Sequence, residues 1–145
     1  MRLLIISLFI LSLGYSKGII KGEQEYPLDK FKEQNSQIIK MVVSEISKDL
    51  PQKVDKYTTM TNIRDENLTL IYIFEINTGS KSDEAVIKDD KYRMQKAVTK
   101  GVCQSSKRFL DANISLAYEY KSAISKKELF TFFIDKQKCK ELKYD

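Results

Sequence analysis

The two cysteines are the residues of this chain whose chemistry is best defined. Cys103 and Cys139 lie far apart in the sequence, so they do not form the Cys-x-x-Cys pair typical of redox-active proteins. In an oxidising compartment an even number of cysteines usually forms disulfides, and two cysteines allow one intramolecular pairing. We therefore expect a structural Cys103–Cys139 disulfide if the chain is exported.

Other residue types that perform catalysis are scarce. The 145 residues include no histidine, which removes Ser-His-Asp and Cys-His catalysis and histidine metal sites. No phosphate-binding loop, dinucleotide fingerprint or calcium loop occurs. The acidic pairs Asp83-Glu84 and Asp89-Asp90 are the nearest approach to a carboxylate site, and their polar context favours a solvated helix start. We expect no enzyme, no cofactor and no metal.

Aromatic and aliphatic residues are concentrated in segments predicted to be strands. Core packing explains most of them, but large aromatic side chains also concentrate where proteins bind one another. If helices cover a single face of the sheet, part of these side chains is left for a partner. The candidate partner-binding sheet face comprises Tyr57, Ile71, Ile73, Phe130 and Phe132.

The elements that must position these residues follow from hydrophobic periodicity. Apolar residues at steps of three and four predict helices over 28–49 and 83–110. Alternating or continuous short apolar runs predict strands over 54–63, 68–76, 114–120 and 129–134. The order is α-β-β-α-β-β. We expect an α+β fold with an antiparallel four-stranded sheet and two helices packed on one face.

The N-terminal residues have the pattern of a secretory signal peptide. Arg2 precedes the apolar run LLIISLFILSL (residues 3–13), and Gly14-Tyr15-Ser16 provides small residues before Lys17. The run is shorter than the roughly 20 residues that span a bilayer. We expect a signal peptide over 1–16 with cleavage near Ser16, a flexible lead over 17–26 and one domain over 27–145. A buried helix and an uncleaved anchor are the alternatives.

The charge pattern and the amino-acid composition limit the classes of partner that the chain can bind. The formal net charge is +5, but lysines alternate with acids along the chain, which indicates a solvated surface and argues against nucleic-acid binding. Abundant Lys, Ile and Asn indicate a bacterial gene. We expect a periplasmic or secreted protein that binds another envelope or secreted protein and has no membrane span after cleavage. An immunity or inhibitor protein and a carrier of a small apolar ligand remain alternatives, as does an enzyme built on carboxylates and tyrosines.

Several segments together carry a resemblance. They are LPQKVDKYTTM (50–60), LIYIF (70–74), Cys103 with Leu110, YEY (118–120) and Cys139. This pattern resembles small exported bacterial α+β proteins of unassigned function, which place one cysteine on the second helix and one after the last strand. Secretion pilotins are similar in size and in their mix of elements. Pilotins are usually lipoproteins, whereas no cysteine lies near the end of the apolar run here. The resemblance implies an accessory protein without catalytic residues.

Overall fold

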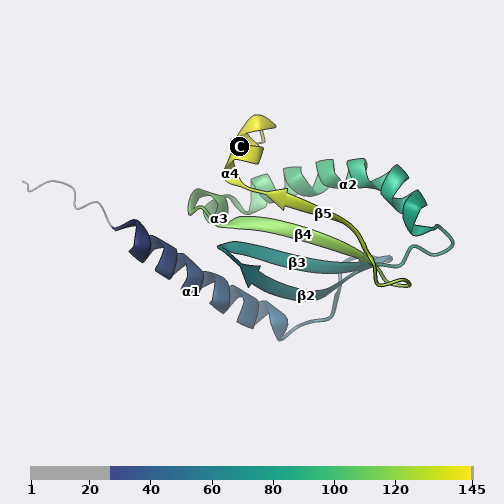
Figure 1. The fold of residues 1–145 in the computed structure, drawn as a ribbon, viewed down its shortest axis with the longest axis horizontal. Coiled ribbons are helices and arrows are strands. Elements are labelled where there is room, and N and C mark those ends of the chain that lie inside the picture. Colours follow the sequence, from purple (N-terminus) through teal and green to yellow (C-terminus); the bar gives the residue numbers. More distant parts are fainter. Residues whose placement is uncertain (1–26, 145) are drawn as a thin grey trace, which may run out of the picture.

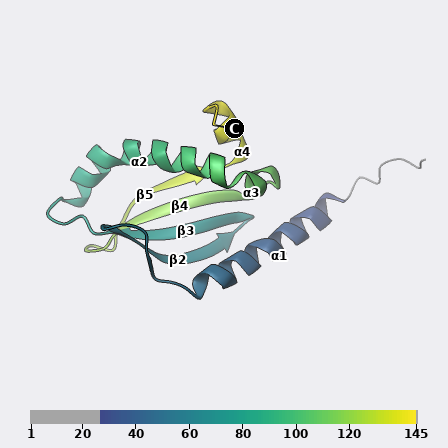
Figure 2. The same ribbon diagram turned by 180° about the vertical axis from the view of Figure 1, so that it is seen from behind.

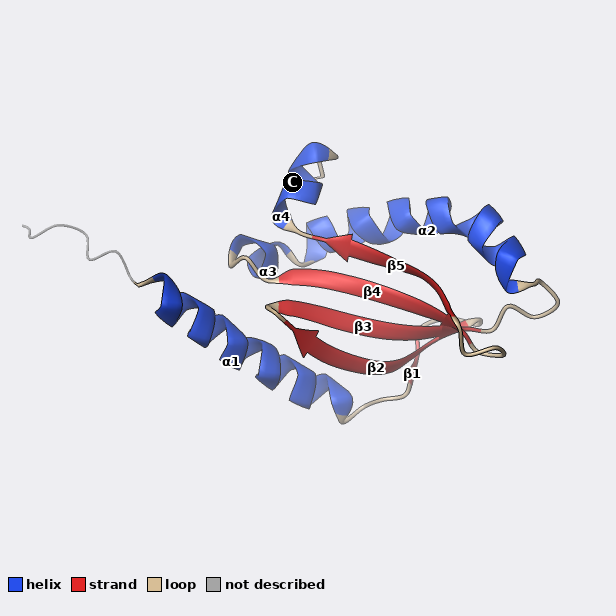
Figure 3. Ribbon diagram, in the orientation of Figure 1, coloured by secondary structure: helices blue, strands red, loops and turns tan. Residues whose placement is uncertain are grey.

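The computed structural model describes residues 27–144, and the predicted signal peptide (1–16) and lead (17–26) lie outside this range. Four helices and five strands alternate along the chain (Figure 1; Figure 3). They are α1 (Leu28–Ser47), β1 (Gln52–Lys53), β2 (Thr58–Glu66), β3 (Thr69–Ile76), α2 (Asp83–Ser105), α3 (Lys107–Asp111), β4 (Ser115–Ser122), β5 (Glu128–Ile134) and α4 (Lys136–Glu141). The α+β class is therefore as predicted, with more elements than expected.

The sheet is mixed, which corrects the prediction of four antiparallel strands. Its order is β1-β2-β3-β4-β5, and β3 and β4 are parallel whereas the other neighbours are antiparallel. The reason is the connection through α2 and α3. A helix that packs along the sheet returns the chain to the end where the preceding strand began, and the next strand then runs in the same direction.

The first hairpin is tighter and longer than predicted. Strand β2 continues to Glu66, beyond the end of the strand predicted over 54–63. The reversal is made by Asn67 and Leu68, which have φ angles of 46° and 60°. Two successive residues with positive φ are typical of the short turns whose twist suits a β-hairpin. The strand propensity of the residues before the turn therefore extends β2 to the turn itself.

Short polar side chains define where the later helices begin and end. The Ser82 hydroxyl accepts a hydrogen bond from the Ala85 N–H (3.2 Å) and caps α2. The helix predicted over 83–110 is interrupted at Ser106, whose φ and ψ of −110° and 22° are not helical, and α3 follows. Beyond the last predicted strand the chain forms α4, which Asp135 caps by accepting from the Lys138 N–H (2.7 Å). Periodicity therefore reveals neither α4, which has a side-chain N-cap, nor α3, which has none.

The core lies between the sheet and helices α1 and α2, which pack on the same face. Ile39 of α1 and Val102 of α2 belong to one buried cluster with Leu70, Leu116 and Ile134 of the strands. We call this the helix-side face; the strands' alternate side chains form the open face. Within residues 27–144 the buried cluster of the open face contains strand residues alone. None of the described helices is long and apolar enough to cross a membrane.

Candidate partner-binding surface

The five residues predicted to form one partner-binding face are divided between the two faces of the sheet. Phe130 and Phe132 are 3% and 2% exposed and belong to the core on the helix-side face. Ile71 and Ile73 lie on the open face and are each 7% exposed. Tyr57 lies just before β2 and is 58% exposed. The prediction of one shared, exposed face is therefore wrong for these residues.

Strand register explains the division. Phe132 is paired with Tyr118 and Phe130 with Tyr120, so both phenylalanines point to the side of these tyrosines. In β3, Tyr72 is paired with Tyr118 on the same side, and Ile71 and Ile73 alternate with it. The sequence placed Phe130 and Phe132 with the isoleucines because β5 is apolar on both faces, so its pattern does not determine its orientation.

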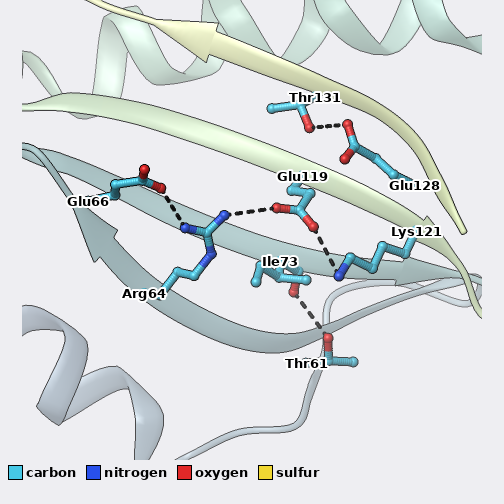
Figure 4. Close-up of polar contacts among 8 residues, drawn as sticks. All are labelled: Thr61, Arg64, Glu66, Ile73, Glu119, Lys121, Glu128 and Thr131. Atoms are coloured by element: carbon cyan, nitrogen blue, oxygen red, sulfur yellow. Dashed lines mark hydrogen bonds and ion pairs between the residues drawn. The ribbon is translucent and has the colours of Figure 1, made fainter. Parts of the chain in front are cut away.

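The open face is covered by charged side chains. Arg64 Nη1 donates to Glu66 Oε2 (2.9 Å) and Arg64 Nη2 donates to Glu119 Oε2 (3.4 Å). Lys121 Nζ lies 3.0 Å from Glu119 Oε1. The Arg64–Glu119 contact joins β2 to β4 and therefore crosses the intervening β3 (Figure 4).

The apolar residues of the open face lie below these ion pairs. Ile71, Ile73 and Ala117 form a small buried cluster on this side. Ile71 is paired with both Arg64 and Ala117, and Ile73 with Glu119, so the charged chains are direct neighbours of the isoleucines. Long charged side chains can cover apolar surface with their methylene groups while their ends remain in water. Over β3 and β4 the open face is thus polar, whereas Phe133 of β5 is an exposed apolar side chain on it.

Aromatic rings stack across the helix-side face. Tyr72 and Tyr118 have ring centroids 5.1 Å apart, Tyr118 and Phe74 5.6 Å, and Phe74 and Tyr120 5.0 Å. The stack continues to Phe130 and Phe132, whose rings are 5.0 Å apart. Such offset contacts stabilise aromatic pairs beyond the burial of their area. The array is a continuous aromatic surface across the three strands β3, β4 and β5.

Part of this array is left half-buried. Phe74, Tyr120, Phe130 and Phe132 are buried, whereas Tyr72 and Tyr118 are of intermediate exposure. We call Tyr72 and Tyr118 the tyrosine pair. Burial raises the pKa of Tyr118 to about 12, with a smaller contribution from Tyr72. The phenol is therefore neutral at physiological pH and available as a hydrogen-bond donor rather than as a base.

The position of the helices explains this partial exposure. Helix α1 packs on β2 and β3, and α2 packs on β5. Both views of the fold show α1 and α2 on opposite sides of the middle strands β3 and β4 (Figures 1 and 2). The Asn35 side-chain amide donates to the Ala112 carbonyl oxygen (2.7 Å), which fixes α1 to the segment between α3 and β4. The tyrosine pair lies on the strands between the two helices.

The cysteines are bonded to each other. Cys103 near the end of α2 and Cys139 of α4 form a disulfide with a Cα–Cα distance of 5.6 Å, and both residues are buried. In the chain-entropy account, closing a loop of this length stabilises a fold by about 3–4 kcal/mol. Cys139 is the buried residue of α4, and the disulfide joins this short helix covalently to α2.

Two carboxylates of the acidic pairs, Asp90 and Asp83, take part in ion pairs and hydrogen bonds at the surface. Asp90 contacts Arg93 (2.9 Å) and Lys81 (3.3 Å), and their hydrogen bonds lower the pKa of this carboxyl group. The Ser125 hydroxyl donates to Asp83 and lowers the pKa of Asp83 in the same way. A general acid needs a raised carboxyl pKa. Among the described residues, no three His, Cys, Asp or Glu side chains are grouped to hold a metal.

The sequence matches one family model. Residues 33–130, more than half of the chain, match the family described as "Domain of unknown function (DUF8479)". The chain belongs to this family. The matched region contains both faces of the sheet, including the tyrosine pair and the Arg64–Glu119 contact, and ends within β5. We found no significant sequence match among curated proteins.

Solved structures with the same fold include two secretion pilotins. A candidate secreted protein of Pseudomonas aeruginosa is 15% identical, with a TM-score of 0.66 over 75% of this chain and 96% of that one. The Vibrio vulnificus type 2 secretion pilotin EpsS is 11% identical, with a TM-score of 0.64 over 77% and 96%. The Vibrio cholerae type II secretion pilotin AspS is 17% identical, with a TM-score of 0.61 over 77% and 98%. The resemblance to pilotins and small secreted proteins is therefore confirmed for the fold.

Sequence reasoning missed the tyrosine pair and the charged cover of the open face. In the sequence, Tyr72 and Tyr118 have the same strand pattern as the other aromatic residues, which core packing explains. Their distinct exposure depends on where α1 and α2 lie on the sheet. The ion pair between Arg64 and Glu119 joins residues 55 positions apart, and it forms because parallel pairing brings β4 next to β3.

Proposed function

We propose that this protein is an exported, non-enzymatic accessory domain of the bacterial cell envelope that binds another protein. The apolar run at residues 3–13 supports export, because it has the length and flanks of a signal peptide. The Cys103–Cys139 disulfide supports an oxidising compartment. The fold is shared with the EpsS and AspS pilotins, whose names place them in type II secretion systems.

The observation that carries this proposal is the half-buried tyrosine pair. Tyr72 and Tyr118 stack at 5.1 Å on the middle strands, between helices that pack on either side of them. Stacked, rigid aromatic rings with polar hydroxyl ends are typical of the residues that dominate binding energy at protein interfaces. The proposed partner segment is apolar and contacts the two rings between α1 and α2.

Site-specific crosslinking tests the surface directly. A photoreactive phenylalanine analogue is introduced at Tyr118 in the full-length chain and expressed in the native cell type, which is then irradiated. We expect one dominant crosslinked protein of the envelope, identified by mass spectrometry. Its identity also distinguishes an envelope component from the toxin or enzyme that an immunity or inhibitor protein would bind.

A matched control uses the open face. Phe133 of β5 is 54% exposed and points to the face opposite Tyr118, so the same analogue at Phe133 should not capture this protein. Equal capture from both positions would indicate nonspecific proximity and would remove the tyrosine pair as the binding site. Irradiated cells that give no adduct at Tyr118 would contradict the proposal.

A further inference from the structure

Within residues 27–145 the surplus positive charge lies in the C-terminal part, over residues 96–145. Residues 27–95 contain 11 Lys and Arg and 12 Asp and Glu. Residues 96–145 contain 11 Lys and Arg but only six Asp and Glu. The fold places much of this surplus around α3 and α4, two short helices that lie close together near the same end of the sheet (Figure 1). An uneven charge distribution of this kind favours binding of anions at one end of the molecule.

A small cavity lies within this cationic end. It has a volume of about 110 Å³. Its lining includes Lys107 of α3, Lys136 and Lys140 of α4, the carboxylate residue Asp111 and both cysteines of the disulfide. Since the disulfide fixes α4 against α2, the lysines on α4 are held beside the lysine on α3 rather than on a free tail.

The three lysines converge on a single carboxylate. Lys136 Nζ lies 2.9 Å from Asp111 Oδ1. The pKa of Asp111 is lowered by this hydrogen bond and by the charges of Lys136, Lys107 and Lys140. Within the small cavity one carboxylate faces three ammonium groups, so the lining carries more positive than negative charge and attracts an additional anion.

A larger cavity continues from the small one. It has a volume of about 610 Å³ and shares Leu110, Lys136 and Lys140 with it. Its remaining lining is rich in neutral and acidic hydrogen-bonding groups: Asn113, Ser115, Asp135, Gln137 and Glu141, together with Ile114. Amides donate and accept hydrogen bonds and carboxylates accept them. This lining is suited to hydroxyl groups, whereas its acids would repel a second anion.

We propose that these two cavities bind a phosphate ester of a polyhydroxylated compound. The phosphate occupies the small cavity between Lys107, Lys136 and Lys140, where it forms charge-assisted hydrogen bonds. The hydroxylated carbon skeleton extends into the larger cavity and bonds with its amide, hydroxyl and carboxylate groups. Sugar phosphates, glycerol phosphate and a phosphatidylglycerol headgroup share this chemistry.

Titration of the full mature protein tests the site. Glucose 6-phosphate, inorganic phosphate and glucose are compared by isothermal titration calorimetry at low ionic strength. We expect glucose 6-phosphate to bind most tightly, phosphate about tenfold more weakly, and glucose not measurably, since the charged group contributes most of the attraction. Binding of the ester should weaken in 0.5 M salt because salt screens the lysines. A wild-type protein that binds neither the ester nor vesicles containing phosphatidylglycerol would overturn the proposal.

Vesicle binding identifies the source of the phosphate. Co-sedimentation is measured with phosphatidylglycerol vesicles and with phosphatidylcholine vesicles, whose headgroup carries no net charge. Binding to the first kind alone, competed by glycerol 3-phosphate, would assign the site to a lipid headgroup. Binding of free esters without vesicle binding would assign it to a soluble metabolite or cell-wall fragment of the same class.

Three variants locate the site. Lys136→Gln combined with Lys140→Gln should weaken glucose 6-phosphate binding at least about tenfold. Lys88→Gln removes an exposed charge from the N-terminal part of α2, whereas Cys103, which lines the small cavity, lies near the other end of this helix, and the substitution should change binding less than about twofold. Asp111→Asn removes the competing carboxylate and should tighten binding several-fold. Unchanged affinity in the double variant, or weaker binding after Asp111→Asn, would exclude this site even if the double variant proves less stable.

Discussion

The two faces of this sheet bury apolar residues by different means. On the helix-side face, rings from β3, β4 and β5 stack on one another and against residues of α1 and α2. On the open face, Ile71, Ile73 and Ala117 are buried without any contribution from the described helices. One ion pair that crosses β3 from β2 to β4 and another within β4 take the place of the helical layer there. The same strands therefore carry a packed core on one side and a charged cover on the other.

This difference predicts which face of the sheet contributes more to the free energy of unfolding. Removing a ring from a close-packed core leaves a cavity and loses both burial and contacts. Removing a charge from a partly exposed ion pair loses much less, because water replaces the lost partner. The helix-side face should thus contribute most of the stability of the domain. The ion pairs of the open face should mainly shield the isoleucines of the sheet from water.

Substitutions of neighbouring phenylalanines should give the largest contrast. Phe132 is 2% exposed and stacks on Phe130, whereas Phe133 is 54% exposed on the open face. We expect Phe132→Ala to reduce the free energy of unfolding by about 3–5 kcal/mol, and Phe133→Ala by less than about 1 kcal/mol. Urea denaturation followed by circular dichroism measures both. Similar losses at the two positions would contradict the proposed difference between the faces.

Alkaline pH should destabilise the helix-side face through its tyrosines. The folded pKa of Tyr118 is about 12 against an ordinary value of 10.0, because burial disfavours the phenolate. The folded protein therefore binds more protons than the unfolded chain between these values, and stability falls as pH rises from about 10 through about 12. The contribution of this residue is about 2–3 kcal/mol. Burial also raises the pKa of Tyr72 and Tyr120.

The matched test replaces the hydroxyl alone. Tyr118→Phe keeps the ring and should lose less stability than the wild type between pH 9 and pH 11.5. Tyr92→Phe alters an exposed tyrosine of α2 and should keep the wild-type pH dependence. Denaturation midpoints at the two pH values provide the comparison. Identical pH dependence in the wild type and Tyr118→Phe would argue against burial of the Tyr118 phenol.

Much of this architecture could be predicted from local patterns. The 3.6-residue periodicity before Pro51 predicts α1, and alternation in residues 68–76 predicts β3 with its two apolar faces. Two cysteines in a chain with an export pattern predict the disulfide. These features depend on neighbouring residues or on counting, so a single sequence contains the information.

Strand direction and face assignment depend on longer distances. Local sequence patterns do not predict that the connection through α2 returns the chain to the end of the sheet where β3 begins. This return makes β3 and β4 parallel. In β5, Leu129-Phe130-Thr131-Phe132-Phe133 has apolar residues on both sides, so period-two alternation could not assign Phe132 to the core and Phe133 to solvent. The tyrosine pair and the Arg64–Glu119 contact were missed for the same reason, since both arise only after the strands are aligned.

The open face should respond to loss of its central carboxylate with a smaller effect. The Glu119 side chain is 11% exposed and contacts both Arg64 and Lys121. We expect Glu119→Gln, which keeps the size of the side chain, to lower the free energy of unfolding by about 1 kcal/mol. Glu45→Gln breaks the exposed Lys48–Glu45 pair of α1 and should cost less than about 0.5 kcal/mol. Urea denaturation at low and high salt separates the two, since salt weakens exposed pairs more than partly buried ones. Equal effects of the two substitutions would mean that the charges over Ile71 and Ile73 are as loosely held as those on the helix surface, and that the isoleucines are shielded by strand packing alone.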